Sequence, residues 1–245
     1  MMQTDKQDHR SGEESGSPDG RSHLLELTAL AALVLILISP LIYLQRDSYS
    51  IGPESPTELH FVGSPRCGEC HQGAYEKWRG SHHDLAMDIA TEETVLGDFN
   101  DARYTDPYNQ VTSHFFRQDD KFMVTTEGPD GPPESFEITH VFGVYPLQQY
   151  LVPFPGGRLQ CLNIAWDTRD NRWYRLPPYE IKDTEDWLHW TRGGQTWNGM
   201  CAECHSTRLV KNYDMEQDSY RTSWFEIDVG CESCHGPGSR HDAWA

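Results

Sequence analysis

Three short segments of the chain combine two cysteines and a histidine in the same arrangement. They are CGECH (Cys67–His71), CAECH (Cys201–His205) and CESCH (Cys231–His235), and they contain six of the seven cysteines. Two thiols three positions apart on a tight turn can each bond one vinyl group of a haem, and the adjacent histidine then lies under the iron. The repeated Cys-x-x-Cys-His pattern therefore predicts c-type haem attachment at three places.

Each position in the pattern has one role in this chemistry. The cysteines expected to form thioether bonds are Cys67, Cys70, Cys201, Cys204, Cys231 and Cys234. The histidines expected to give iron its proximal nitrogen are His71, His205 and His235. A haem bonded in this way cannot dissociate, so a chain with little regular secondary structure can hold it. The predicted cofactors are three covalent haems c.

Two other interpretations of the cysteines explain less of the pattern. A structural zinc site would use paired cysteine couples. That interpretation leaves the first segment without a partner couple, and it does not explain why a histidine follows each of the three couples. A redox dithiol would be a single couple in a thioredoxin-like order of strands and helices, which the sequence lacks. The seventh cysteine, Cys161, lies in a stretch of alternating apolar residues and is expected to be buried and structural.

Histidines are abundant outside the three motifs. Seven of them follow the apolar segment near the N-terminus: His60, His82, His83, His114, His140, His189 and His241. Six-coordinate irons would need three more nitrogen ligands, and this supply favours two histidines on each iron.

Several segments resemble one family. WRGSHHDLAM (Trp78–Met87) resembles the W-x-x-S-x-H-x-x-A-M element of the cytochrome c-552/c-554-like multihaem family, and CHGPGSRH (Cys234–His241) resembles its C-H-G-P-G-x-x-H element. FGVYPLQQYLVPFPGGRLQ (Phe142–Gln160) and LHWTRGGQTWNGMCAECHS (Leu188–Ser206) are similar to the subgroup often fused to tetratricopeptide repeats. The resemblance covers roughly Phe61 to Ala245.

The resemblance implies which histidines are distal ligands. His83 is implied as one, and His241 as a second that serves a different haem from that of its own motif. His189 is the third choice, and His82 is a substitute for His83. The remaining candidates are held in reserve: His60, His114 and His140.

The implied fold is a multihaem cytochrome c, in which loops and short helices hold the haems over a domain of residues 60–245. Alternating apolar residues predict a β-rich insert over about residues 110–176. We also expect a helix around Ala74–Ala90, a turn-like stretch over Asp98–Asn109, and a hairpin over Phe115–Pro133 that closes on the turn EGPDG. Longer members of the family continue with at least one more haem motif; if the chain is a fragment of such a protein, a fourth haem and a repeat module are missing from it.

Leu24–Leu44 is an apolar segment whose one charged residue, Glu26, lies near its start. At about 1.5 Å of rise per residue, this length spans a hydrocarbon core of roughly 30 Å and predicts one transmembrane anchor. A cleaved signal peptide, the alternative, would have a shorter apolar region of about 7–15 residues that ends in small residues. Three basic residues precede the segment and one follows it closely, namely Lys6, Arg10 and Arg21 before and Arg46 after.

This charge distribution favours a cytoplasmic N-terminus. Residues 1–23 are polar and are expected to form a disordered cytoplasmic tail, and residues 45–59, rich in Ser and Pro, to form a linker. Haem is attached to such proteins outside the cytoplasm. The predicted location is therefore the inner (cytoplasmic) membrane, as a single-pass protein whose haem domain faces the periplasm or an equivalent space.

The net charge is -18, which argues against nucleic-acid binding because that requires a basic face. The leading hypothesis is electron transfer between redox partner proteins through three haems, with the second and third close because their motifs are close in sequence. The alternative is a multihaem oxidoreductase that acts on a small nitrogen or sulfur compound at an iron with an open site, but no paired acid–base residues indicate one. A third hypothesis is an assembly module that docks a partner.

Overall fold

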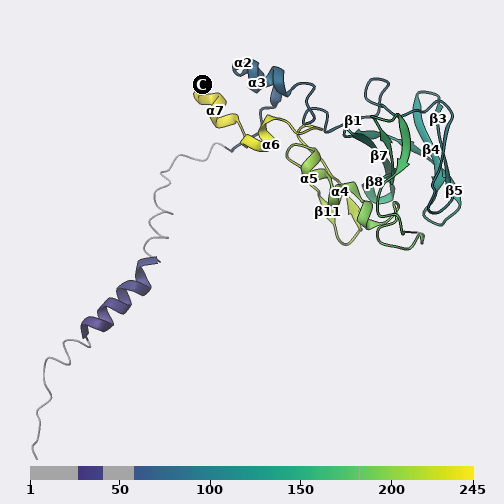
Figure 1. Cartoon of the computed structure of the whole chain (residues 1–245). Helices are drawn as coiled ribbons and strands as arrows, with labels where there is room; N and C mark the ends of the chain where they lie inside the picture. Colours follow the sequence, from purple (N-terminus) through teal and green to yellow (C-terminus); the bar gives the residue numbers. More distant parts are fainter. Residues whose placement is uncertain (1–26, 41–57, 182) are drawn as a thin grey trace, which may run out of the picture. The chain divides into compact units, whose positions relative to one another are not determined.

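The computed structural model describes residues 27–40, 58–181 and 183–245 (Figure 1). The chain divides into two units, residues 1–57 and 58–245. In the first unit, residues 27–40 form a helix with exposed side chains. The ends of the predicted anchor, residues 24–26 and 41–44, lie outside the described residues, as do the predicted tail and residues 45–57 of the linker. Across the described ranges, no helix combines the length and apolar character needed to cross a membrane.

The second unit contains two larger antiparallel sheets. One sheet has the order β1-β6-β7-β9-β10, with β8 paired to β7, and the other has the order β2-β3-β4-β5. The strands of the first are β1 (Met87–Ile89), β6 (His140–Phe142), β7 (Leu147–Phe154), β8 (Arg158–Cys161), β9 (Ile164–Asp167) and β10 (Arg172–Arg175). Those of the second are β2 (Ala102–Thr105), β3 (Thr112–Gln118), β4 (Lys121–Glu127) and β5 (Pro133–Ile138).

The first sheet is buried on both faces. Successive side chains of a strand point to opposite faces, and along β7 Tyr150 and Val152 join one hydrophobic cluster while Leu151 joins another. The first cluster also contains Phe115 from β3, so it joins the two sheets. The second cluster contains Trp197, so the opposite face of the first sheet carries the segment that leads into the second motif.

Short helices hold the three motifs. The first motif lies on α2 (Ser64–Cys70), followed by α3 (Gln72–Trp78), and the third on α6 (Cys231–His235), followed by α7 (Ser239–Trp244). The second motif follows α4 (Trp197–Met200) and includes α5 (Ala202–His205). Minor elements are η1 (Pro155–Gly157), η2 (Gly193–Gln195) and the small sheet of β11 (Tyr213–Asp214) and β12 (Ser219–Tyr220). The mixed helix-and-sheet architecture is as expected, and α7 lies near α2 and α3 (Figure 1).

Three local predictions were wrong in detail. The helix expected around Ala74–Ala90 ends at Trp78, because Arg79 leaves helical geometry and Gly80 has φ 72°, and Met87–Ile89 then pairs with β6. The stretch expected to be turn-like contains β2. The hairpin of β3 and β4 closes on Asp119 and Asp120, where Asp119 has φ 53°, a conformation that aspartate tolerates. The turn EGPDG instead joins β4 to β5.

Candidate haem-binding site

The first and third motifs share one cavity. It has a volume of about 510 Å³, which lies within the usual range for bound cofactors. Its walls include Cys67 and His71 from the first motif and Cys231 and His235 from the third, together with His241 from α7. Thiols and imidazoles, the groups that bond haem and its iron, are therefore gathered around a space of suitable size.

Buried carboxylates position these two motifs. Glu232, inside the third motif and 3% exposed, accepts hydrogen bonds from the backbone N–H groups of Val62 (2.9 Å), Gly63 (2.7 Å) and Gly238 (2.6 Å). Because carboxylates accept such bonds strongly, Glu232 fastens the chain before α2 and the chain after α6 to one point. Glu232 was not among the residues predicted from the sequence, although its place inside a Cys-x-x-Cys-His motif was a signal for it.

A second carboxylate, Glu226, holds the start of α2. It accepts hydrogen bonds from the Ser64 N–H (2.8 Å) and hydroxyl (3.1 Å), and the Ser64 oxygen accepts one from the N–H of Cys231 (2.9 Å). A Cβ on Gly230 would lie 2.1 Å from a Glu226 oxygen, so only glycine fits between these groups. The first cysteine of the third motif is thus fixed directly to the start of the helix that carries the first motif.

The first cysteines of these two motifs are neighbours. Burial raises the pKa of the Cys67 thiol, and the nearby Cys231 thiol raises it further. In all three motifs the first cysteine is partly buried and the second is exposed. Each motif therefore presents one thiol toward the protein and one toward its outer side.

The rings of His71 and His241 are neighbours, and their planes are nearly parallel. Their ring centroids are 6.0 Å apart and their planes differ by 22°. Two metal–nitrogen bonds of about 2 Å separate the centroids of opposed imidazoles by about 6 Å. The distance between the His71 and His241 rings is thus compatible with both of them binding one iron, which would be held in the cavity that both residues line.

In the second motif, His205 has its ring orientation fixed. Its Nδ1 donates a hydrogen bond to the carbonyl oxygen of Ala86 at 3.0 Å, and Phe142 packs edge-on against the ring at 5.3 Å. Since Nδ1 carries the proton, Nε2 keeps a free lone pair for a metal.

The segment that contains His83 is tied to the chain just before the third motif. Trp78 Nε1 donates to the carbonyl of Val229 (3.0 Å), and the Val229 N–H donates to the carbonyl of His83 (3.1 Å). His83 is exposed, and the ring of the adjacent His82 lies 6.3 Å from that of Tyr145. The segment therefore lies close in space to the third motif, whereas the cavity walls do not include His83.

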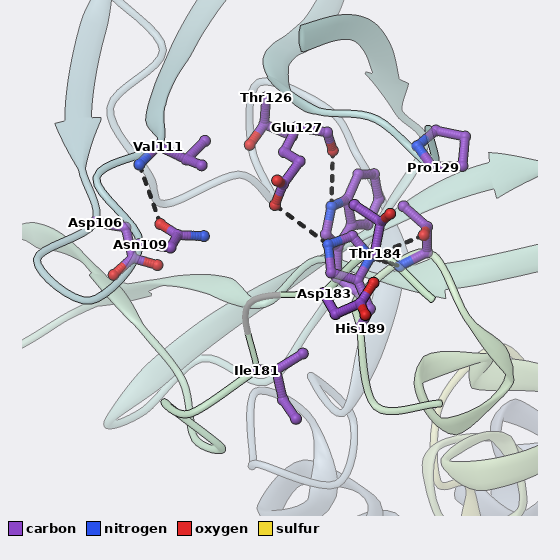
Figure 2. Close-up of polar contacts among 12 residues, drawn as sticks. Asp106, Asn109, Val111, Thr126, Glu127, Pro129, Ile181, Asp183, Thr184 and His189 are labelled. Carbon is purple, nitrogen blue, oxygen red and sulfur yellow. Dashed lines mark hydrogen bonds and ion pairs between the residues drawn. The ribbon is translucent and has the colours of Figure 1, made fainter. Parts of the chain in front are cut away.

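His189 lies in the segment between β10 and α4, and its ring is beside Glu127 at the end of β4. It is 3% exposed, its Nδ1 lies 2.9 Å from the Thr191 hydroxyl, and its Nε2 lies 3.3 Å from a carboxylate oxygen of Glu127 (Figure 2). The Glu127 carbonyl also accepts a hydrogen bond from Trp190 Nε1 at 2.9 Å. Both ring nitrogens thus have protein partners, and His189 is not brought together with the cavity of the first and third motifs.

The reserve histidines have separate surroundings. His114, on β3, contacts Asp101 and stacks on Phe116. His140, on β6, has its pKa lowered by burial. The backbone N–H of His60 donates a hydrogen bond to the Ser239 hydroxyl at 3.0 Å. None of the three lines the cavity.

Short helices that present thiols and an imidazole around a haem-sized space define a class, the c-type cytochromes, whose haem is covalently bound. A family model described as cytochrome c554 and c-prime matches residues 66–128, which contain the first motif, and residues 179–236, which contain the other two. The chain belongs to this cytochrome c554 family. No curated protein and no solved structure matches it. The assignment supports haem-based electron transfer with redox partner proteins.

Proposed function

We propose that the protein binds three haems c and passes electrons between redox partner proteins outside the cytoplasm, anchored to the inner membrane by Leu24–Leu44. The observation that supports the electron-transfer proposal is the cavity shared by the first and third motifs, where the ring centroids of His71 and His241 are 6.0 Å apart. Haem supplies one-electron iron chemistry when bound.

The chain's residues would hold each iron with two imidazoles. His71 and His241 are the best supported pair, because their rings are 6.0 Å apart and both line the cavity. His205 and His235 would serve as proximal ligands in the other two motifs, and His83 as a distal ligand, in keeping with its place near Val229. That His189 is a distal ligand remains a prediction. The contacts of its two ring nitrogens with Thr191 and Glu127 do not favour it.

The motifs are close enough to exchange electrons. Haems bonded at Cys67 and Cys231 would be attached close to each other, because these two thiols are neighbours. The second motif is linked to the third as well, because the hydroxyls of Thr207 and Ser233 are 2.7 Å apart. The third motif thus lies next to the first motif and next to Thr207, two residues after the second motif, and would be the centre of the electron path.

The membrane anchor and the location depend on the sequence of Leu24–Leu44, and the helix over residues 27–40 is compatible with them. The mass of the mature protein tests both haem number and anchor retention. It should equal that of the whole chain plus three haems when the protein is purified from a host that attaches haem. A lower haem count, or loss of the N-terminal residues, would contradict the corresponding part of the proposal.

Carbon monoxide tests the coordination of the irons. The reduced protein should show no spectral shift with carbon monoxide if every iron has two protein ligands. His241→Ala should open one site and produce a shift, whereas the control His114→Ala should not, because His114 lies on β3 beside Asp101. A shift in the unchanged protein would support the alternative, an oxidoreductase with an open iron.

A further inference from the structure

The one cysteine outside the motifs lies beside a motif cysteine. Cys161 ends β8 and is 2% exposed, and its Sγ lies 3.9 Å from the Sγ of Cys201, the first cysteine of the second motif. All seven cysteines lie in the described part of the chain and all are free thiols. Cys161 has no part in the proposed haem attachment, so the proposed function does not explain why its sulfur lies beside that of Cys201.

Protein contacts alone bring the two cysteines together. Next to Cys161, the Gln160 side chain accepts a hydrogen bond from the Thr196 hydroxyl (2.6 Å), and the Leu159 N–H donates to the Asn198 side chain (2.8 Å). Trp197 is fully buried in the same cluster as Cys161. The segment that leads into Cys201 is therefore docked on β8 by hydrogen bonds and apolar packing.

The two thiols differ in the properties that thiol–disulfide exchange requires. The hydrogen bond between the two sulfurs lowers the pKa of Cys201 and raises that of Cys161. Cys201 is also the more exposed of the two. Since the thiolate is the attacking species, an external disulfide meets Cys201 first, and Cys161 is in place to complete the exchange.

We propose that Cys161 and Cys201 form a disulfide in the chain before haem is attached, and that this bond withholds Cys201 from thioether formation. The effect on thioether formation rests on the proposed role of Cys201 in haem binding, whereas the disulfide itself does not. The sulfurs must move from 3.9 Å to about 2.05 Å, which side-chain rotation can supply. The second motif would then receive haem only under reducing conditions.

The oxidant is a small disulfide such as oxidised glutathione. The Cys201 thiolate attacks one sulfur of the oxidant, forms a mixed disulfide and releases one glutathione thiolate. The Cys161 thiol, after losing its proton, attacks the Cys201 sulfur and releases the second glutathione. Two protein thiols are oxidised by two electrons, one small disulfide is reduced to two thiols, and a dithiol reductant reverses the exchange.

Peptide mapping tests the bond itself. The full chain is produced without haem-attachment machinery, treated with oxidised glutathione, alkylated and cleaved after Arg and Lys. Cys161 then lies alone on the peptide 159–169, and Cys201 and Cys204 lie together on 193–208. We expect these two peptides to be joined through Cys201, as shown by fragmentation. Alkylated Cys161, or a bond from Cys161 to Cys204, would overturn the proposal.

Two variants sharpen the mapping. Cys161→Ser should abolish the joined peptides completely, whereas Cys204→Ser should retain them, because only the first removes a member of the proposed pair. Loss of the joined peptides in both variants, or in neither, would show that the fold does not select Cys161 and Cys201.

Haem loading tests the consequence. In a host that attaches haem, without added reductant, Cys161→Ser should raise the fraction of peptide 193–208 that carries haem relative to the unchanged chain. Peptides with the first and third motifs are the internal standard. Their failure to carry haem would overturn the proposed function. If they carry haem and the second motif loads equally in both proteins, only the disulfide inference fails.

Discussion

The two sheets and the helices of the first and third motifs are held together in different ways. In the sheets, aromatic side chains fill a continuous core in which the rings of Phe115 and Trp173 stack with centroids 3.7 Å apart. In α2, α3, α6 and α7, the only buried residues are Ser64 and Glu232, and neither is apolar. The sheets are completed by the polypeptide, whereas these helices surround a cavity of about 510 Å³ that a cofactor would complete.

The second motif belongs to the first of these regions. Trp197 and Ala202 are buried on the outer face of the first sheet. Haem attachment should therefore change the stability of the first and third motifs more than that of the second. The following substitutions test this contrast.

The largest effect is expected in the aromatic core. Trp173→Ala removes the ring that packs on Phe99, Phe115 and Tyr150 and should lower the free energy of unfolding by about 4 kcal/mol. Denaturant titration followed by far-ultraviolet circular dichroism measures it. The control is Trp187→Ala. Because Trp187 is 65% exposed, its replacement should change the free energy of unfolding far less. Equal losses in the two variants would show that the aromatic cluster does not dominate the stability of the sheets.

A smaller and more local effect is expected from Glu232→Gln. The amide cannot accept all the hydrogen bonds that the carboxylate receives from Val62, Gly63 and Gly238, and about 2 kcal/mol should be lost. Amide hydrogen exchange should quicken around α2 and α6 while the sheets stay protected. Glu203→Gln, at an exposed position inside the second motif, is the matched control. Faster exchange throughout the sheets would contradict the separation of the two regions.

The smallest effect concerns pH. Burial, and then the charges of Glu226, Asp84 and Asp88, raise the pKa of Asp228 to about 7 from 3.8, and its Oδ1 accepts no hydrogen bond from the described residues. Between these pKa values the folded state binds more protons than the unfolded state, so stability falls as the pH rises and the loss is complete above about 7.

Asp228→Asn removes this loss. Because Asp228 is only partly buried, the gain should be about 1 kcal/mol at pH 8 and should shrink as the pH is lowered toward 4. Thermal unfolding at several pH values measures it, with Asp130→Asn in an exposed loop as the control. A gain that does not depend on pH would mean that the charge of Asp228 is not its cause.

Sequence patterns predicted the β-rich part of the fold well where alternation was regular, as in β3 and β4. They failed at Gly80, where one residue with φ 72° ends a helix that the apolar pattern would have extended. In the site, the resemblance implied His241 as a distal ligand; its ring lies 6.0 Å from that of His71, and its role as a ligand stays a prediction. Neither pattern nor resemblance identified Glu232, because its function depends on N–H groups that come from elsewhere in the chain.

The sequence by itself determined where covalent chemistry can occur, because two thiols and an imidazole within five residues are placed by local geometry. Only the tertiary structure decided which motifs meet. Gly63 and Glu232, 169 positions apart, are joined by a hydrogen bond, and Cys161 reaches Cys201 only because α4 docks on β8. Such pairings depend on how the chain folds back on itself, which spacing along the sequence does not encode.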